Sequence, residues 1–223
     1  MPLTVEQAYD MLHGAQARSP TLRRLWRHAA GDDYPEAFEH LSFVTRTELH
    51  RIADCLRLVS SSTLVDLACG TGGPGLWIAR ETGVRLVGID VSAVALARAA
   101  ERAAGRGLSG RAHYRRGTFA ETGLPDADAG GGLPGHGEDP IDDYRPSVES
   151  AGLALEVYEE TQGWRERLEA TWGALLSHRA ALVEEMGETV VRATLGELSQ
   201  AVERGPYRRR VLGVATFVGS GVA

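Results

Sequence analysis

Residues 66–90 carry the residue types with the most evident chemistry. A glycine-rich segment, GTGGPG at residues 70–75, follows a short apolar run and precedes apolar residues at helical spacing. Glycine has no side chain, so backbone N–H groups at a helix start can approach an anionic or polar ligand closely. Asp90 lies 18 residues after Gly72, near the spacing of the ribose-binding acid in dinucleotide-binding proteins. By itself, this pattern leaves the class of ligand open.

Three neighbouring features narrow that class. Asp66 lies inside the apolar run, where a carboxylate is awkward beside a pyrophosphate but suits a cationic α-amino group. Asp90 precedes Val91, which places an acid for a ribose beside an apolar residue for an adenine face. GLPD, at residues 123–126, follows the third apolar run. A nicotinamide-dependent oxidoreductase remains an alternative. The three features together favour a nucleoside ligand other than a nicotinamide dinucleotide.

Together, the segments VDLACGTGGPGLWIAR, GIDVSAVALARAAERA and ETGLPDADA resemble small-molecule S-adenosylmethionine-dependent methyltransferases of the class I, Rossmann-like type. The similarity extends to the helical region around SFVT and to DDYRPSVESAGLALEVYEE. It implies S-adenosylmethionine as cofactor, with Asp66, Gly70 and Gly72 at its methionine end, Asp90 at the ribose and Val91 at the adenine. The cofactor-binding residues that we expect are Asp66, Ala68, Cys69, Gly70, Thr71, Gly72, Asp90, Val91, Thr118 and Phe119.

Two residues depart from the family pattern. Ala68 replaces the first glycine of the loop, a change that we expect the fold to tolerate. Thr118 follows Gly117 where the family usually has an acid that accepts a hydrogen bond from the adenine amino group. Adenine binding would therefore depend more on Phe119 and on packing.

The elements that must position these residues alternate strand and helix. Apolar runs predict strands at residues 64–68, 85–89 and 112–116, with helices around 76–79 and 94–104. Such alternation is typical of parallel βαβ units. We therefore expect an α/β fold, a Rossmann-like three-layer sandwich with a mostly parallel sheet.

The flanking regions are expected to be largely helical. Thr4 and Thr45 open capping boxes, and Ser19 precedes Pro20 as an N-cap precedes the first helical position. Residues 164–203 predict two long amphipathic helices separated near Gly187. Strands are expected at residues 153–158 and 211–218, and a short helix after Asp142 or Asp143. We predict an N-terminal helical lid at 1–60 and a cofactor domain at 61–223, with a helical insertion at 161–205.

The segment after GLPD is shorter than the family requires. A fourth strand, a helix and a fifth strand would need about 30 residues or more, yet only residues 129–141 separate Asp128 from the next helix. These two strands are expected to be missing. We predict a shortened sheet of about five strands, in the order 3-2-1 at its preserved side, closed within the chain or by homodimerisation.

Composition excludes several classes of function. All 24 basic residues are Arg, so Schiff-base chemistry and a P-loop lysine are absent. The net charge of −6 argues against nucleic acid or an anionic membrane as the main partner. Cys55 and Cys69 alone can form neither a disulfide framework nor a metal site. The start lacks the features of a targeting peptide, so a cytoplasmic location is expected.

We predict an S-adenosylmethionine-dependent methyltransferase acting on a small-molecule acceptor. No catalytic residue is assigned, because the cofactor is already activated and the protein mainly aligns donor and acceptor. His136 and Cys69 are interpreted as non-catalytic, and the four tryptophans as packing residues. The main alternative is a truncated, non-catalytic homologue that binds the cofactor or a protein partner.

Overall fold

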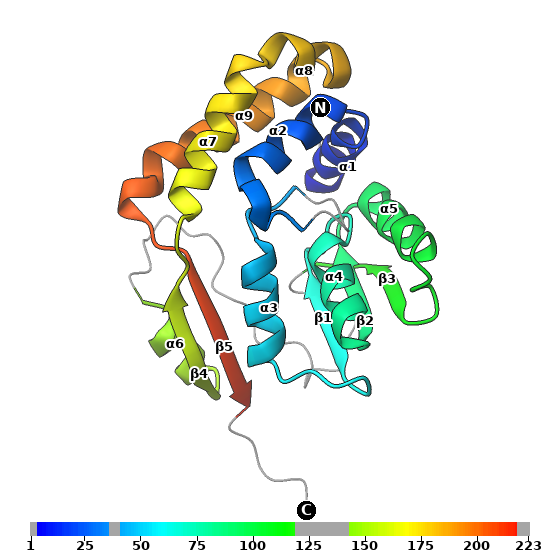
Figure 1. Cartoon of the computed structure of the whole chain (residues 1–223), viewed down its shortest axis with the longest axis vertical. Coiled ribbons are helices and arrows are strands. Elements are labelled where there is room, and N and C mark those ends of the chain that lie inside the picture. The colour runs from blue at the N-terminus through cyan, green and yellow to red at the C-terminus, as the bar shows by residue number, and fades with distance from the viewer. Residues whose placement is uncertain (1–3, 36–40, 119–142, 218–223) are drawn as a thin grey trace, which may run out of the picture. The chain divides into compact units, whose positions relative to one another are not determined.

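The computed structural model describes residues 4–35, 41–118 and 143–217 of the chain (Figure 1). It contains two compact units. The first comprises Met1–Thr122 and Gly163–Tyr207, and the second comprises Gly123–Gln162 and Arg208–Ala223. Phe119 and His136 lie outside the described residues.

The first unit contains a parallel sheet of three strands in the order β1-β2-β3. Helix α4 connects β1 to β2, and helix α5 connects β2 to β3. Both pairings are parallel, which confirms the predicted βαβ units and the 3-2-1 order. The bounds are β1 (Thr63–Leu67), α4 (Gly73–Thr82), β2 (Arg85–Asp90), α5 (Ala93–Ala104) and β3 (Ala112–Arg116).

The most buried side chains of this sheet lie on its central strand, β2. Leu86 and Ile89 of β2 are almost completely buried, because β2 is paired on both edges and packs against α4 and α5. One core cluster joins these elements to α3 (Arg46–Cys55). It contains Leu49, Leu76, Trp77, Ile78, Ala79, Val84, Leu86, Ala103, Leu108 and Ala112.

The N-terminal helices begin at the predicted caps. α1 and α3 open with complete capping boxes at Thr4 and Thr45. The Ser19 hydroxyl accepts from the Leu22 N–H at the start of α2. The bounds here are α1 (Val5–Gln16), α2 (Pro20–Ala30) and the 3₁₀ turn η1 (Gly31–Asp33).

The C-terminal helices share a core with α1 and α2. They are α7 (Trp164–Ser177), α8 (Arg179–Met186) and α9 (Glu188–Arg204), followed by the 3₁₀ turn η3 (Gly205–Tyr207). The expected break at Gly187 is present, but a second break at His178, where φ is −110°, was not predicted. Nothing in the helical spacing marks that break. Trp26 is buried in this second core, with Trp164 and Trp172 packed against it.

The second unit pairs its two strands with each other. β4 (Leu153–Glu160) and β5 (Val211–Phe217) are antiparallel, with an irregularity between Leu155 and Val157. Helix α6 (Arg145–Ser150) precedes them, and the Asp143 carboxylate accepts from the Arg145 N–H.

The expected single sheet of about five strands is therefore wrong, because the described strands form one sheet of three and one of two. Antiparallel hydrogen bonding satisfies β4 and β5 mutually, whereas β1 pairs only with β2 within the described residues. The predicted loss of two strands falls on residues 129–141, outside the described residues. The α/β class and the shortened, mostly parallel sheet are confirmed.

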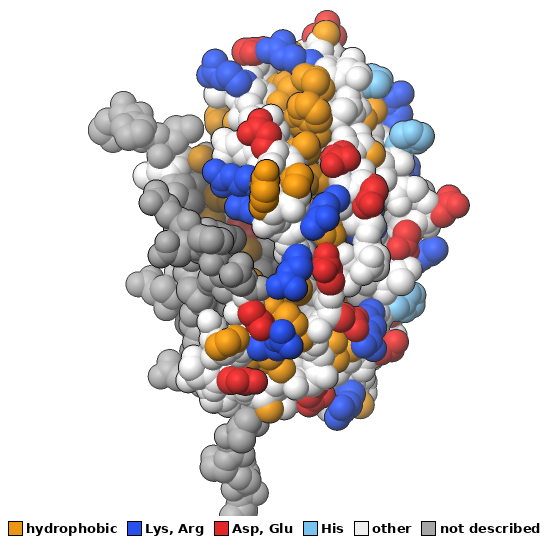
Figure 2. Space-filling view, turned by 90° about the vertical axis from the view of Figure 1, so that its left-hand side faces the viewer, with side chains coloured by type: hydrophobic (Ala, Val, Ile, Leu, Met, Phe, Trp, Pro, Cys, Tyr) orange, Lys and Arg blue, Asp and Glu red, His pale blue; other side chains and the backbone are white. Residues whose placement is uncertain are grey.

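The surface carries both signs of charge. Figure 2 shows acidic and basic side chains interspersed on one face of the described chain. Among the helices that the structure describes, none is long and apolar enough to cross a bilayer. The expectations about nucleic acid and membranes stay predictions.

Candidate functional site

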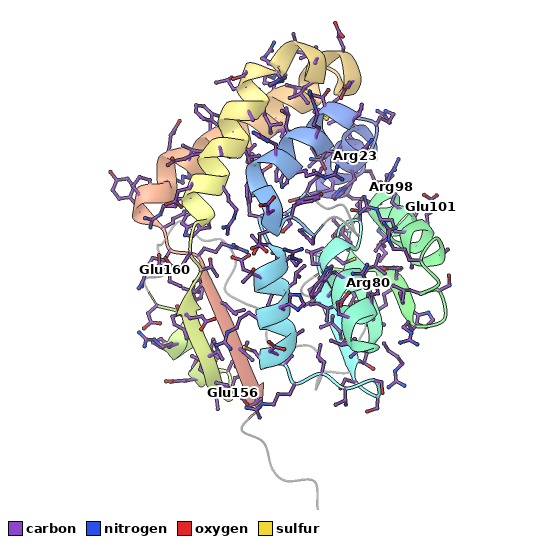
Figure 3. All side chains as sticks on the ribbon, in the orientation of Figure 1. Arg23, Arg80, Arg98, Glu101, Glu156 and Glu160 are labelled. Atoms are coloured by element: carbon purple, nitrogen blue, oxygen red, sulfur yellow. The ribbon has the colours of Figure 1, made fainter. Side chains whose placement is uncertain are left out.

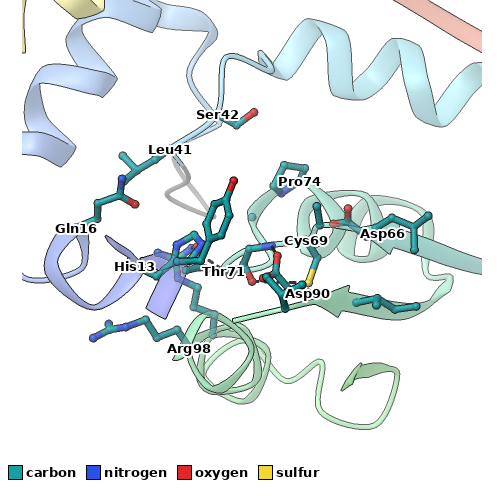
Figure 4. Close-up of a pocket in the computed structure, with 18 of the residues that line it drawn as sticks. His13, Gln16, Leu41, Ser42, Asp66, Cys69, Thr71, Pro74, Asp90 and Arg98 are labelled. Carbon is teal, nitrogen blue, oxygen red and sulfur yellow. Dashed lines mark hydrogen bonds between the residues drawn. The ribbon is translucent and has the colours of Figure 1, made fainter. Parts of the chain in front are cut away.

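A pocket of about 710 Å³ lies in the first unit beside the glycine-rich loop (Figure 4). Its volume falls within the range of small-molecule sites, and the carboxyl ends of parallel strands are where α/β folds bind ligands. The lining residues are Tyr9, His13, Gln16, Ala17, Arg23, Tyr34, Leu41, Ser42, Asp66, Leu67, Ala68, Cys69, Gly70, Thr71, Gly73, Pro74, Ile89, Asp90, Val91, Arg98, Arg102, Gly117 and Thr118.

Asp90 ends β2 and fixes the backbone around it. It is 7% exposed. Its Oδ2 accepts from the Gly70 N–H at 2.8 Å, and its Oδ1 accepts from the Ser92 N–H at 2.8 Å. Because each carboxylate oxygen has more than one lone-pair site, Asp90 can hold the loop and still accept hydrogen bonds from ligand hydroxyls.

Asp66 lies on β1 in a different environment. Its Oδ2 is enclosed and has no hydrogen-bond partner among the described residues. Burial raises its pKa to about 6; the Gly75 N–H opposes this shift, and the Asp90 carboxylate adds to it. A Cβ at Gly75 would lie 2.6 Å from the same oxygen, so glycine is required there. A buried carboxylate with one oxygen unpartnered among the described residues favours a cationic or hydrogen-bond-donating ligand.

The loop between these carboxylates adopts left-handed backbone conformations. Gly70 and Gly72 have φ values of +52° and +78°, which glycine adopts without strain. A Cβ at Gly72 would lie 3.0 Å from Ala99 Cβ and 3.1 Å from the Tyr114 hydroxyl. Gly72 therefore allows the loop to pack closely against α5 and β3.

Ala68 also has a positive φ, at +56°. An L-residue in this region costs about 1–2 kcal/mol. The replacement of the family glycine is accommodated, and it leaves the backbone in the glycine-type conformation.

Helix α5 supports the loop from its side. Arg102 Nη1 donates to the Thr71 carbonyl at 3.3 Å and to Thr71 Oγ1 at 2.9 Å. Beneath the loop, Cys69 is 6% exposed, and burial is the largest cause that raises the pKa of its thiol. A thiol with a raised pKa is unreactive, which agrees with a packing role for Cys69.

Helix α1 supplies a wall of the pocket that the motifs did not indicate. Asp10 Oδ1 accepts from Ser92 Oγ at 2.6 Å and from the Val94 N–H at 3.2 Å, so α1 is attached to the start of α5. The Ser92 hydroxyl bond is the largest cause that lowers the pKa of Asp10. His13 lies near the loop, since a Cβ at Gly70 would be 3.6 Å from His13 Cε1.

His13 is held in a partly buried position. Burial lowers its pKa, although the carboxylates of Asp90 and Asp10 oppose that shift. The ring is stacked against Tyr9, with centroids 6.2 Å apart. A neutral imidazole in this place can donate or accept a hydrogen bond.

The structure brings most of the sequence-predicted site residues to one place. Gly72 does not line the pocket, and Phe119 lies outside the described residues. The predicted residues on the lining are Asp66, Ala68, Cys69, Gly70, Thr71, Asp90, Val91 and Thr118.

Sequence reasoning missed the residues contributed by α1, α2 and the segment around Ser42. Helical spacing identified those helices but gave no signal for which of their side chains face a ligand. Within the described part of the chain, no cluster of three or more His, Cys, Asp or Glu side chains could hold a metal ion.

Comparisons with known proteins agree with this arrangement. Residues 64–130, which begin in β1 and include α4 to β3, match the family described as a methyltransferase domain. A sterol 24-C-methyltransferase of Eremothecium gossypii is 32% identical over 78 residues, covering 35% of this chain and 21% of that relative. The matches cover between a fifth and a third of the length of the curated relatives.

Solved structures share the fold across the chain. The crystal structure of the 4+2 cyclase SpnF is 20% identical with a TM-score of 0.66, covering 98% of this chain and 99% of that chain. A Thiobacillus denitrificans S-adenosylmethionine-dependent methyltransferase, solved with S-adenosyl-L-homocysteine, is 18% identical with a TM-score of 0.54 and covers 96% of this chain and 98% of that one. Residues 64–130 thus match a methyltransferase domain, and the chain shares the Rossmann-like α/β fold of these solved structures.

Proposed function

We propose that the chain binds S-adenosylmethionine in this pocket and transfers its methyl group to a small-molecule acceptor. The observation that carries the proposal is the pair of carboxylates beside the loop. Asp66 has an enclosed oxygen without a partner in the part of the chain that the structure describes, and Asp90 is held at the next strand end. The methyltransferase-domain match over residues 64–130 supports the same ligand.

The residues present fit this cofactor better than a dinucleotide. Asp66 offers a negative charge where the cofactor has an ammonium group, whereas a pyrophosphate would meet repulsion there. The bare backbone at Gly70 leaves room beside His13. Val91 and Thr118 line the pocket, and we propose that they lie along the adenine. When bound, the cofactor supplies an activated methyl group on its sulfonium.

The chain's own contribution is to orient ligands and to exclude water. Asp90 accepts hydrogen bonds from the ribose hydroxyls while it holds Gly70 and the start of α5 in place. Helix α1 lies against the loop through Asp10 and His13. We propose that residues 1–60 act as a lid and that residues 61–223, including an insertion at 161–205, form the cofactor domain. No group in this proposal needs to act as a general base.

The acceptor is proposed to be small, because the pocket of about 710 Å³ must hold the cofactor as well. The similarity to a sterol methyltransferase and to the Thiobacillus denitrificans methyltransferase does not identify the methyl acceptor of this chain. We further propose a cytoplasmic protein that uses neither nucleic acid nor a membrane as its partner and that can form a homodimer.

A second candidate is cofactor binding without methyl transfer. Residues 119–142 are 24 in number, which is fewer than a strand, helix and strand require. The fold itself does not prescribe methyl transfer, since SpnF is a cyclase.

Calorimetry with S-adenosylhomocysteine and with NAD tests the cofactor. We expect binding of the former and its weakening in Asp66→Asn, while the exposed control Asp54→Asn binds as the wild type does. Binding of NAD alone would overturn the assignment.

Turnover needs a separate experiment. The wild-type chain is incubated with S-adenosylmethionine carrying a labelled methyl group and a panel of small amines, alcohols and carboxylates. Labelled product that is absent with Asp66→Asn supports methyl transfer. Tight S-adenosylhomocysteine binding without incorporation into any acceptor favours the non-catalytic candidate.

A further inference from the structure

Arg98 is a half-buried cation on the pocket lining that the cofactor motifs do not explain. It lies on α5, one turn before Arg102. In Figure 4, it extends from α5 on the side of the pocket where His13 and Gln16 lie. The proximity is also electrostatic, because the Arg98 charge is one of the causes that lower the pKa of His13.

The two arginines of this helix face have different partners. Arg102 donates to the Thr71 carbonyl and hydroxyl and so supports the loop. Arg98 makes no hydrogen bond or ion pair with any residue in the described ranges. Glu101, the nearest acid along α5 (Figure 3), is exposed and is not paired with it.

A half-buried guanidinium is stabilised by an anionic partner. Its planar fork matches a carboxylate through two parallel hydrogen bonds. We propose that Arg98 forms a carboxylate-binding subsite of the pocket.

The carboxylate has two possible sources under the proposed function, on which this inference rests. One is the amino-acid end of the cofactor, which carries both an ammonium and a carboxylate group. The other is the acceptor molecule. The two sources are distinguished by comparing a ligand that carries the amino-acid end, a ligand that lacks it and a simple carboxylate.

Calorimetry with two nucleosides tests the first source. S-adenosylhomocysteine carries the amino-acid end, whereas 5′-methylthioadenosine lacks it. If Arg98 binds the cofactor carboxylate, Arg98→Gln weakens S-adenosylhomocysteine binding by about tenfold or more, as expected for a charge-assisted hydrogen bond, and leaves 5′-methylthioadenosine unchanged. Arg106→Gln, an exposed change just after α5, is the matched control, and Arg98→Met, which also removes the charge, replaces Arg98→Gln if the latter does not fold.

Hexanoate, a simple carboxylate, tests the second source when added to protein saturated with S-adenosylhomocysteine. Binding to the wild type that is lost in Arg98→Gln assigns the subsite to the acceptor. Equal behaviour of wild type and variant with all three ligands overturns the inference. Failure of the wild type to bind either nucleoside instead contradicts the proposed cofactor, so the two failures are distinguishable.

Discussion

The carboxyl ends of β1 and β2 each carry an aspartate, and the two side chains are supported differently. At the end of β2, both oxygens of Asp90 accept backbone N–H groups, from Gly70 and from Ser92. On β1, Asp66 Oδ2 is enclosed without a partner in the described chain, and burial raises the pKa of Asp66 to about 6. The first arrangement stabilises the site before any ligand arrives. The second leaves an electrostatic cost that a ligand can offset.

The largest effect is expected at Asp90. Asp90→Ala removes the acceptor for two N–H groups, and unsatisfied buried donors cost about 1–3 kcal/mol each. We expect thermal unfolding to show a loss of about 2–4 kcal/mol and calorimetry to show no S-adenosylhomocysteine binding. Asp90→Asn, which keeps one acceptor oxygen, should retain more stability. Full stability of Asp90→Ala would show that these bonds contribute little.

At Asp66, stability and binding are expected to move in opposite directions. The pKa of Asp66 is raised from 3.8 to about 6 in the folded protein. The protonated carboxyl therefore contributes fully to the stability of the folded state below about pH 4, and this contribution is lost as the pH rises through about 6. That loss is about 3 kcal/mol. Asn has no charge to bury, so Asp66→Asn should remove this pH-dependent loss of stability. The variant should then be more stable than the wild type near neutral pH.

The same substitution should weaken S-adenosylhomocysteine binding by about 10- to 100-fold near pH 7, because a charge-assisted hydrogen bond is lost. Wild-type affinity should fall as the pH is lowered through about 6, where Asp66 becomes protonated. His13 also faces the pocket, and it remains in both proteins, so the difference between their pH profiles isolates Asp66. Parallel profiles would contradict the assignment.

A smaller effect is expected where α1 joins the Asp90 region. Asp10→Asn removes the charge that accepts from Ser92 Oγ and the Val94 N–H. We expect a loss of about 1 kcal/mol in stability and about a threefold to tenfold loss in S-adenosylhomocysteine affinity. Glu6→Gln, also on α1, is the control, because the ion pair between Glu6 and Arg116 of β3 is at the surface and such pairs contribute little. Equal effects of the two substitutions would argue against a specific role for Asp10.

The smallest effect is expected at the loop itself. Ala68→Gly relieves the strain of φ +56°, worth about 1–2 kcal/mol, but increases the entropy of the unfolded chain by about 0.4–1 kcal/mol. Chemical denaturation should show an unchanged or slightly raised stability. Ala68→Val should be destabilising, since branched residues tolerate positive φ poorly, and a stable valine variant would contradict the strain argument.

The preserved part of the fold was predictable because its signals are local. Thr4, Ser19 and Thr45 accept hydrogen bonds from nearby backbone groups, and each was identified as a helix start. The three parallel strands followed from short apolar runs between helices. The break at His178 was missed because no glycine or proline marks it, and the division into two sheets was missed because strand pairing joins residues far apart in the sequence.

The sequence by itself determined that a glycine-rich loop follows the first of two neighbouring parallel strands and that each strand carries an acid near its end. Apolar periodicity and glycine spacing dictate these elements locally. Only the tertiary structure decided what each acid does. Whether a carboxylate is satisfied or enclosed without a partner depends on backbone groups about twenty residues away, as between Asp90 and Gly70. The approach of α1 to the loop, and the place of Arg98 beside His13, likewise arise from packing between distant segments, which leaves no pattern along the chain.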